Sequence, residues 1–329
     1  EGTKGHRLDV EPEVSLALET DYLTVIPRAG MRYTQYAVDS YGNEPAVVDT
    51  NDKTPSRTLM TAGLSAFSEL ERVYELNPPL APTEQQVGLT RWAKMKHSVI
   101  PRVDYSWVQS ARRQGRLPEF DEFDRIKPKN EITYSLTNVL DRKRETVALG
   151  PDGQTPTIVH DYLDFVRVRL QQSYDRNEAG RDDQTDVYER RPFSDILAEF
   201  IVKPREYVSL ESRSWFSPYE SAFTRHEHLL RLFKEGLGDV YFGYDYQERI
   251  MEYDRRVDEA VQVLELGGNL WLTDKLLVGL DFRTDIEASK DLERSIHLRW
   301  VDDCWSMRAY YSNTDTDNEF GLRFDLFEF

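Results

Sequence analysis

Apolar and polar side chains alternate at every second position through most of this chain. The pattern is clearest near the end, where large apolar residues alternate with small or charged ones: Phe320, Gly321, Leu322, Arg323, Phe324, Asp325 and Leu326. A helix would scatter the four apolar side chains around its axis, whereas a strand places all of them on one face. The same alternation sets one apolar face in three further segments: Leu8, Val10, Val14, Leu16 and Leu18; Val166, Val168 and Leu170; Ile196, Ala198, Phe200 and Val202.

Marking every such stretch predicts an all-β protein of about fifteen strands. We expect them near residues 6–18, 22–38, 58–76, 92–108, 131–148, 158–174, 192–203, 206–217, 221–235, 238–248, 258–272, 276–286, 292–301, 304–312 and 320–329. Several are longer than ten residues, whereas strands of soluble sheets usually have about five or six. Long strands with charges at alternate positions are typical of tilted strands that cross a membrane. The pattern therefore favours an antiparallel transmembrane β-barrel.

The connections between the predicted strands alternate between short and long. Residues 203–205, 235–237 and 273–275 are tight turns, and between them lie longer polar stretches at 39–56, 109–129, 175–191 and 249–257. Outer-membrane barrels have short periplasmic turns and long external loops. We therefore expect the tight turns, including 302–303, to face the periplasm, and 39–56, 109–129 and 175–191 to face outside. The proline-containing connection at 77–91 departs from this rule, because it is long although it lies at the end of the barrel that has the tight turns.

The composition of the chain excludes several other classes of protein. Of 329 residues, 59 are acidic and 42 basic, for a formal net charge of −17, so no basic surplus is available for nucleic acid. No apolar run approaches the roughly 18 residues of a membrane helix. The single cysteine, Cys304, rules out a disulfide within the chain. A barrel remains possible because it buries only alternate residues in lipid.

Candidate catalytic and metal-binding residues give little support to an enzyme. His226 and His228 share one face of a strand, but a third ligand is missing nearby, and we expect both on the water-exposed face of the barrel. The acidic group 315–321 has its glycine one position too late for a calcium loop, so we expect a hairpin tip. The basic group Arg112, Arg113 and Arg116 fits a solvated loop better than a lipid-phosphate site. We predict no catalytic residue, cofactor or metal.

Six segments, in this order and spacing, resemble the C-terminal barrel of the LPS-assembly protein LptD family, also called organic solvent tolerance protein. They are YLTVIPRAGMRYTQY (22–36), HSVIPRVDY (97–105), LPEFD (117–121), NEITYSLTN (130–138), RPFSDI (191–196) and DDCW (302–305). Each segment is weak by itself, but together they cover most of the chain. The resemblance implies that residues 1–329 are the C-terminal part of a larger barrel in the outer membrane of a Gram-negative bacterium, preceded by further strands and a periplasmic domain.

The resemblance also implies a role and partners. Such proteins are non-enzymatic translocons that insert lipopolysaccharide into the outer leaflet through a laterally opening barrel. Their partners are an LptE-like plug lipoprotein, a periplasmic bridge protein docked by the N-terminal domain, and outer-membrane lipid. Cys304 matches a family cysteine that forms a disulfide with the periplasmic domain, although Trp305 replaces the second cysteine of many members. Its partner would then lie outside this chain.

The last strand has a specific role under this interpretation. We expect residues 320–329 to form one edge of the lateral exit, with Phe320, Leu322, Phe324 and Leu326 toward lipid. The terminal Phe329 falls in the opposite phase, so we expect either a bulge near Phe327 or final residues that lie below the lipid. Two alternatives stay open on the sequence alone: a passive porin-like channel, and a soluble structural or adhesive β-protein.

Overall fold

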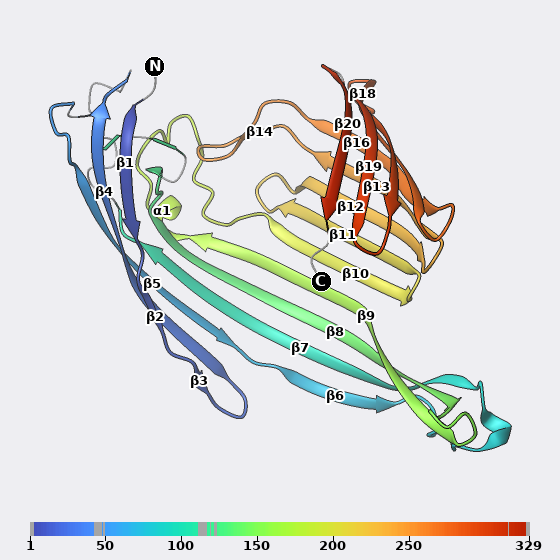
Figure 1. Cartoon of the computed structure of the whole chain (residues 1–329). Helices are drawn as coiled ribbons and strands as arrows, with labels where there is room; N and C mark the ends of the chain where they lie inside the picture. Colours follow the sequence, from blue (N-terminus) through green and yellow to red (C-terminus); the bar gives the residue numbers. More distant parts are fainter. Residues whose placement is uncertain are drawn as a thin grey trace. The chain divides into compact units, whose positions relative to one another are not determined.

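The computed structural model describes the chain except for residues 1–2, 43–47, 49, 111–116, 119, 122–123, 315 and 327–329. Strands make up most of it, and eighteen of them belong to one sheet. The registers between neighbouring strands are antiparallel throughout. Figure 1 shows that these neighbours mostly follow one another directly in the sequence. The all-β class predicted from alternation is confirmed.

The strand bounds are as follows: β1 (Lys4–Val10), β2 (Glu13–Ser15), β3 (Leu18–Glu19), β4 (Thr24–Ser40), β5 (Ser56–Phe67), β6 (Leu70–Glu75), β7 (Thr90–Val108), β8 (Lys129–Leu149), β9 (Pro156–Asp175), β10 (Ile196–Arg205), β11 (Val208–Ser217), β12 (Ala222–Lys234), β13 (Gly238–Gln247), β14 (Ile250–Met251), β15 (Arg256–Val257), β16 (Val261–Trp271), β17 (Leu276–Asp285), β18 (Lys290–Val301), β19 (Trp305–Thr314) and β20 (Asn318–Leu326). Two short helices, η1 (Glu84–Gln86) and α1 (Arg176–Ala179), lie in connections. None of the helices in the described part of the chain is long and apolar enough to cross a membrane.

Every predicted strand is present, and the differences are breaks within strands. The predicted strand 6–18 consists of β1, β2 and β3, which pair in turn with successive parts of β4. The predicted strand 58–76 is divided into β5 and β6, which pair with different parts of β7. These breaks raise the number of strands from fifteen to eighteen. The small hairpin β14–β15, inside the connection 248–260, was not predicted.

The chain divides into two compact units. Unit 1 contains residues 1–69, 100–135 and 172–194, and unit 2 contains 70–99, 136–171 and 195–329. In unit 1, β4 pairs with β5, and β5 pairs with β7. A small apolar core of Tyr36, Val38 and Leu117 lies there, with Tyr41 and Phe120 packed against it.

Unit 2 is dominated by one continuous series of pairings. β9 pairs with β10, and each following strand pairs with the next one through β11, β12, β13, β16, β17, β18, β19 and β20. Two-residue and three-residue turns join β10 to β11 and β12 to β13, and a four-residue turn joins β16 to β17. At the other end the connections after β11, β17 and β19 are also short, so the predicted difference in length holds only for some connections.

Candidate functional site

One face of the unit 2 sheet is apolar from strand to strand. The register places apolar side chains directly opposite one another in rows, the longest being Val208, Leu232, Val240, Gly268, Leu280, Ile296, Tyr311 and Phe320. A second row runs through Val202, Leu210, Leu230, Phe242, Leu266 and Phe282. Many of these residues are exposed, including Val240 at 56% and Leu266 at 52%. An exposed apolar surface of this extent is suited to contact with lipid rather than water.

The opposite face of the same strands is charged. Glu199, Arg213, Glu227 and Asp245 stand opposite one another on β10, β11, β12 and β13. Arg213 Nε lies 3.2 Å from Glu199 Oε2, and Arg213 Nη1 lies 3.6 Å from Glu227 Oε2. Side chains of this kind require water, because an ionised group transferred to hydrocarbon loses its hydration. The sheet therefore separates an apolar from an aqueous environment.

The prediction that His226 and His228 lie on the water-exposed face is wrong. His228 stands opposite Ser212 and Tyr244, two residues from Leu230, and thus lies on the apolar face. The two imidazole rings stack with centroids 5.3 Å apart, and His228 also stacks on the Tyr244 ring. His228 Nδ1 lies 2.9 Å from Ser212 Oγ. Arg225, Glu227 and Arg231 occupy the opposite phase of β12, and sequence reasoning overlooked this signal.

The last strand, β20, takes part in only one register among the described residues, with β19. Its apolar side chains Phe320, Leu322, Phe324 and Leu326 are 59–75% exposed, more than Leu280 (42%) or Ile296 (44%) in the same face of the sheet. The register places Phe320 opposite Tyr311 and Leu322 opposite Ala309, in line with the apolar rows. The shared face of these four residues was predicted correctly. Phe327 and Phe329 lie outside the described residues.

Cys304 lies in the short turn between β18 and β19, and its side chain is exposed and free. In the same turn Asp302 accepts a hydrogen bond from Lys275 Nζ at 2.7 Å. This hydrogen bond, with a second one from the main-chain N–H of Asp303, lowers the pKa of Asp302 below its usual value. The cysteine is therefore accessible at a charged turn, as predicted, while its disulfide partner stays a prediction.

A buried carboxylate in unit 1 joins a connection to three strands. Asp124 is 1% exposed. Its Oδ1 accepts a hydrogen bond from the Tyr36 hydroxyl on β4 at 2.7 Å and lies 3.0 Å from Arg7 Nη1 on β1. Arg57 Nη1 on β5 donates to the main-chain oxygen of Asp124 at 2.8 Å, and the main-chain N–H of Phe120 donates to Asp124 Oδ2 at 2.8 Å. Phe120 and Asp124 are therefore anchored to the sheet.

Sequence reasoning missed this anchor. Both residues lie within the connection 109–129, which was expected to be a solvated external loop. The available signal was the apolar content of the loop, because Leu117 and Phe120 pack against Tyr36. The basic residues Arg112, Arg113 and Arg116 of the same loop lie outside the described residues.

The connection 175–191 is also more ordered than its hydrophilic composition suggests. It begins with α1, whose N-terminus is capped by the Asp175 carboxylate. Arg181 is 8% exposed, and its Nε donates to Glu178 Oε2 at 2.7 Å. Burial tends to raise the pKa of Glu178, but the hydrogen bonds from Arg181 and from the main-chain N–H of Arg191 prevail and hold it below its usual value.

The described residues contain no group of three or more His, Cys, Asp or Glu side chains placed to hold a metal ion. Asp317 lies in the hairpin tip between β19 and β20, where Thr314 Oγ1 donates to the main-chain oxygen of Asp317 at 3.1 Å. The rest of the predicted tip, residues 318–321, belongs to β20. Asp315 lies outside the described residues.

An antiparallel sheet with long strands, one continuous apolar face and one charged face is the construction of a transmembrane β-barrel protein. The sequence model of the LptD family, LPS transport system D, matches residues 1–276. The chain therefore belongs to the LptD family, and it is an outer-membrane protein of the β-barrel class.

Individual relatives agree with this assignment. The chain is 25% identical to the LPS-assembly protein LptD of Alkalilimnicola ehrlichii over 93% of its length, covering 38% of that relative. It is 30% identical to the protein of the same name from Nitrosomonas eutropha over 41% of its length, covering 19% of that relative. For Cupriavidus necator LptD the identity is 22% over 94% of this chain and 36% of the relative. The chain thus spans less than two fifths of each of these relatives.

Proposed function

We propose that this chain forms the C-terminal part of an outer-membrane translocon that inserts lipopolysaccharide into the outer leaflet. The family match supports a role in lipopolysaccharide assembly and gives no support to a passive porin-like channel. The two-faced sheet supplies the surfaces that an amphipathic lipid needs, since sugars and phosphates require water and acyl chains require an apolar surface. In this proposal the charged face lines the route of the polar part.

The observation that carries the proposal is the last strand. A lateral exit requires a strand whose backbone can part from a neighbour, and a strand paired along one side retains unsatisfied N–H and C=O groups along the other. β20 pairs with β19 in the described residues, and its apolar side chains Phe320, Leu322, Phe324 and Leu326 continue the apolar rows. We therefore assign β20 to one edge of the exit. Its partner would be a strand outside this chain.

The remaining partners belong to the same proposal. An LptE-like lipoprotein would plug the barrel, and a periplasmic bridge protein would deliver the lipid through a domain upstream of this chain. Cys304 would form a disulfide with a cysteine outside the chain. The exposed position of Cys304 in a turn supports that pairing, since a disulfide requires the two sulfur atoms to approach within bonding distance.

Photo-cross-linking in the full-length protein tests the role of β20. A photoactivatable side chain is placed at Phe320, and the control position is Leu280, which belongs to the same apolar row three strands away. Lipopolysaccharide passing through the exit should form adducts at 320 well above those at 280. Equal adducts at both positions would show general contact with membrane lipid and would contradict the assignment.

A further inference from the structure

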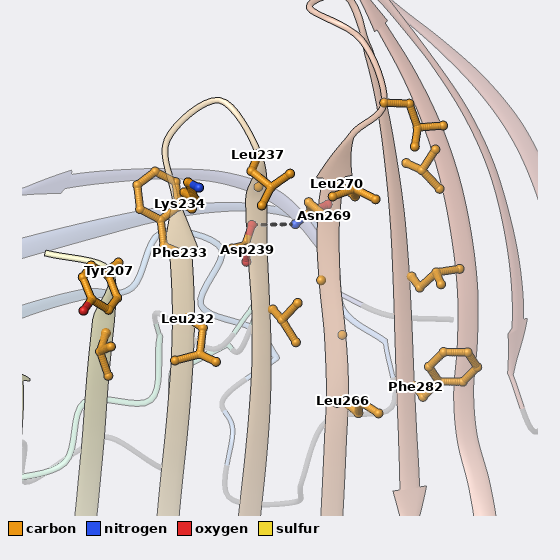
Figure 2. Close-up of a pocket in the computed structure, with 18 residues that line it drawn as sticks. Tyr207, Leu232, Phe233, Lys234, Leu237, Asp239, Leu266, Asn269, Leu270 and Phe282 are labelled. Carbon is orange, nitrogen blue, oxygen red and sulfur yellow. Dashed lines mark hydrogen bonds between the residues drawn. The ribbon is translucent and has the colours of Figure 1, made fainter. Parts of the chain in front are cut away.

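The apolar face of unit 2 is hollowed near the turns that end β12 and β16. The groove has a volume of about 1020 Å³ and is lined mainly by apolar side chains, among them Leu232, Val240, Leu266, Leu280 and Phe282. The lining residues come mostly from β11, β12, β13, β16 and β17, and Figure 2 shows Lys234 and Leu237 beside the β12–β13 turn. Its size lies at the upper end of the usual range for small-molecule sites, about 300–1000 Å³.

A glycine creates this hollow. Gly268 on β16 belongs to the longest apolar row and stands between Val240 on β13 and Leu280 on β17. A Cβ atom at Gly268 would lie 2.5 Å from the main-chain oxygen of Asp239, so the close approach of β13 and β16 excludes a side chain there. The row therefore has a gap at this point, inside the groove.

Two charged side chains line the groove, Lys234 and Asp239, and Asp239 Oδ2 lies 3.7 Å from Arg231 Nε. Lys234 lies at the end of β12 in the phase of Leu230 and Leu232, so its stem belongs to the apolar face. No ion-pair partner of Lys234 is present among the residues that the structure describes. A lysine at the end of a membrane strand extends its ammonium group toward the lipid headgroups.

A second hollow, rich in arginine, adjoins the groove. It has a volume of about 440 Å³ and is lined by Arg91, Trp92, Arg142, Arg144, Arg205 and Glu206, among others. Tyr207, in the β10–β11 turn, lines both hollows, so they are neighbours. Arg142 and Arg144 lie an even number of residues beyond Leu136 on β8, an exposed apolar residue, and thus on the same side of the strand.

The arginine pocket contains more positive charge than the protein neutralises. Arg144 pairs with Asp161 and with Glu206, where Arg144 Nη1 lies 2.5 Å from Glu206 Oε1. Arg142 lies 4.3 Å from the Trp92 ring centroid and donates to the main-chain oxygen of Pro204 at 2.8 Å. Two carboxylates therefore oppose four guanidinium groups.

The arginines also have unsatisfied donors. The Nε atoms of Arg91, Arg142 and Arg144 are buried and have no hydrogen-bond partner in the described structure. A buried donor without an acceptor is unfavourable. An anion in the pocket would offset the repulsion between Arg142 and Arg205. Guanidinium groups favour phosphate, because they match its oxygen atoms with two parallel N–H donors.

We propose that the groove and the arginine pocket together bind one anionic glycerophospholipid, with its acyl chains along Leu232, Val240 and Leu280 and its phosphate among Arg91, Arg142 and Arg205. Both hollows lie at the end of the sheet that carries the tight turns. We expect this end on the periplasmic side, where the outer membrane contains glycerophospholipid, and the choice of lipid rests on that orientation. The site is independent of the route taken by lipopolysaccharide.

Native mass spectrometry of the full-length protein in detergent tests the site. Phosphatidylglycerol, phosphatidylethanolamine with the same acyl chains, lipid A and inorganic phosphate are added in separate titrations. We expect phosphatidylglycerol to be retained in preference to the other three. Equal retention of phosphatidylglycerol and phosphatidylethanolamine would overturn the proposal, as would preferential retention of lipid A or complete displacement by inorganic phosphate.

Variants then locate the binding. Arg91→Gln together with Arg205→Gln should weaken phosphatidylglycerol retention. We expect a loss of about fivefold for each arginine, because one basic residue near an anionic lipid changes the affinity by about this factor. The matched control is Arg299→Gln with Arg308→Gln, two arginines that stand opposite each other on the charged face. The control should retain the lipid as the wild type does, and an equal loss in both pairs would contradict the site.

A separate variant addresses the groove. Leu232→Trp fills part of it and should weaken retention of long-chain phosphatidylglycerol while leaving a short-chain analogue less affected. Each variant is first compared with the wild type by heat-modifiable mobility on gels, which reports folding. The lipid preference of the wild-type protein decides the proposal even where a variant does not fold.

Discussion

Replacing Leu322 with arginine places a charge on the apolar face of β20. Leu322 stands opposite Ala309, and the same row continues through Leu298 and Val278. Leu322 therefore lies in the middle part of β20, away from both strand ends. Leu322 is 67% exposed, so its removal sacrifices little packing within the protein. The dominant cost of Leu322→Arg is the arginine in hydrocarbon, about 2–4 kcal/mol near the membrane midplane.

The neighbouring substitution Arg323→Leu provides the comparison. Arg323 Nε lies 2.9 Å from Asp325 Oδ1, and the Arg323 side chain is 73% exposed. An exposed ion pair of this kind contributes about 0.2–1 kcal/mol. The two substitutions exchange the same residue types at adjacent positions, and we expect Leu322→Arg to be more destabilising by about 2 kcal/mol, which is roughly a thirtyfold change in the folding equilibrium.

The assay is refolding of the full-length protein into lipid vesicles over a urea gradient, followed by tryptophan fluorescence and by heat-modifiable mobility. Leu322→Met is the control for side-chain replacement without charge, and it should refold as the wild type does. Equal effects of Leu322→Arg and Arg323→Leu, or the reverse order, would mean that the two faces of β20 are assigned the wrong way round.

Three further outcomes are expected. Asp124→Ala should lower the free energy of unfolding of the full-length protein by about 3 kcal/mol, because it leaves buried donors unpaired, whereas Tyr36→Phe should cost about 1 kcal/mol; equal costs would contradict the role of the carboxylate. In the full-length protein Cys304→Ser should remove the difference in gel mobility between reduced and non-reduced samples, and an unchanged difference would exclude Cys304 from the disulfide. A cysteine introduced at Asp182 should be labelled on intact cells while one at Asp274 is not, and the reverse would invert the orientation of the barrel.

Strand positions were predictable here because each strand repeats the same two-residue pattern over ten or more residues. β13, β16 and β17 begin and end within a few residues of the predicted ranges. The breaks near residues 11–12 and 68–69 were not predicted, because alternation continues in the sequence while the pairing with β4 and β7 is interrupted.

Contacts between segments far apart in the sequence were beyond prediction. Asp124 is one of 59 acidic residues, and its burial depends on Arg7, Tyr36 and Arg57 from three strands. The arginine pocket likewise gathers Arg91, Arg142 and Arg205 from β7, β8 and β10.

The uninterrupted register between β12, β13 and β16 restricts how the gene can change length. Each of these registers runs through consecutive residues without a bulge. Deleting a single codon within β13 would turn every later side chain of that strand to the opposite face, so that Phe242 would move toward water and Asp245 toward lipid. Codon gains and losses in this part of the gene should therefore be confined to connections such as residues 248–260, where added length leaves the facing of both adjoining strands unchanged.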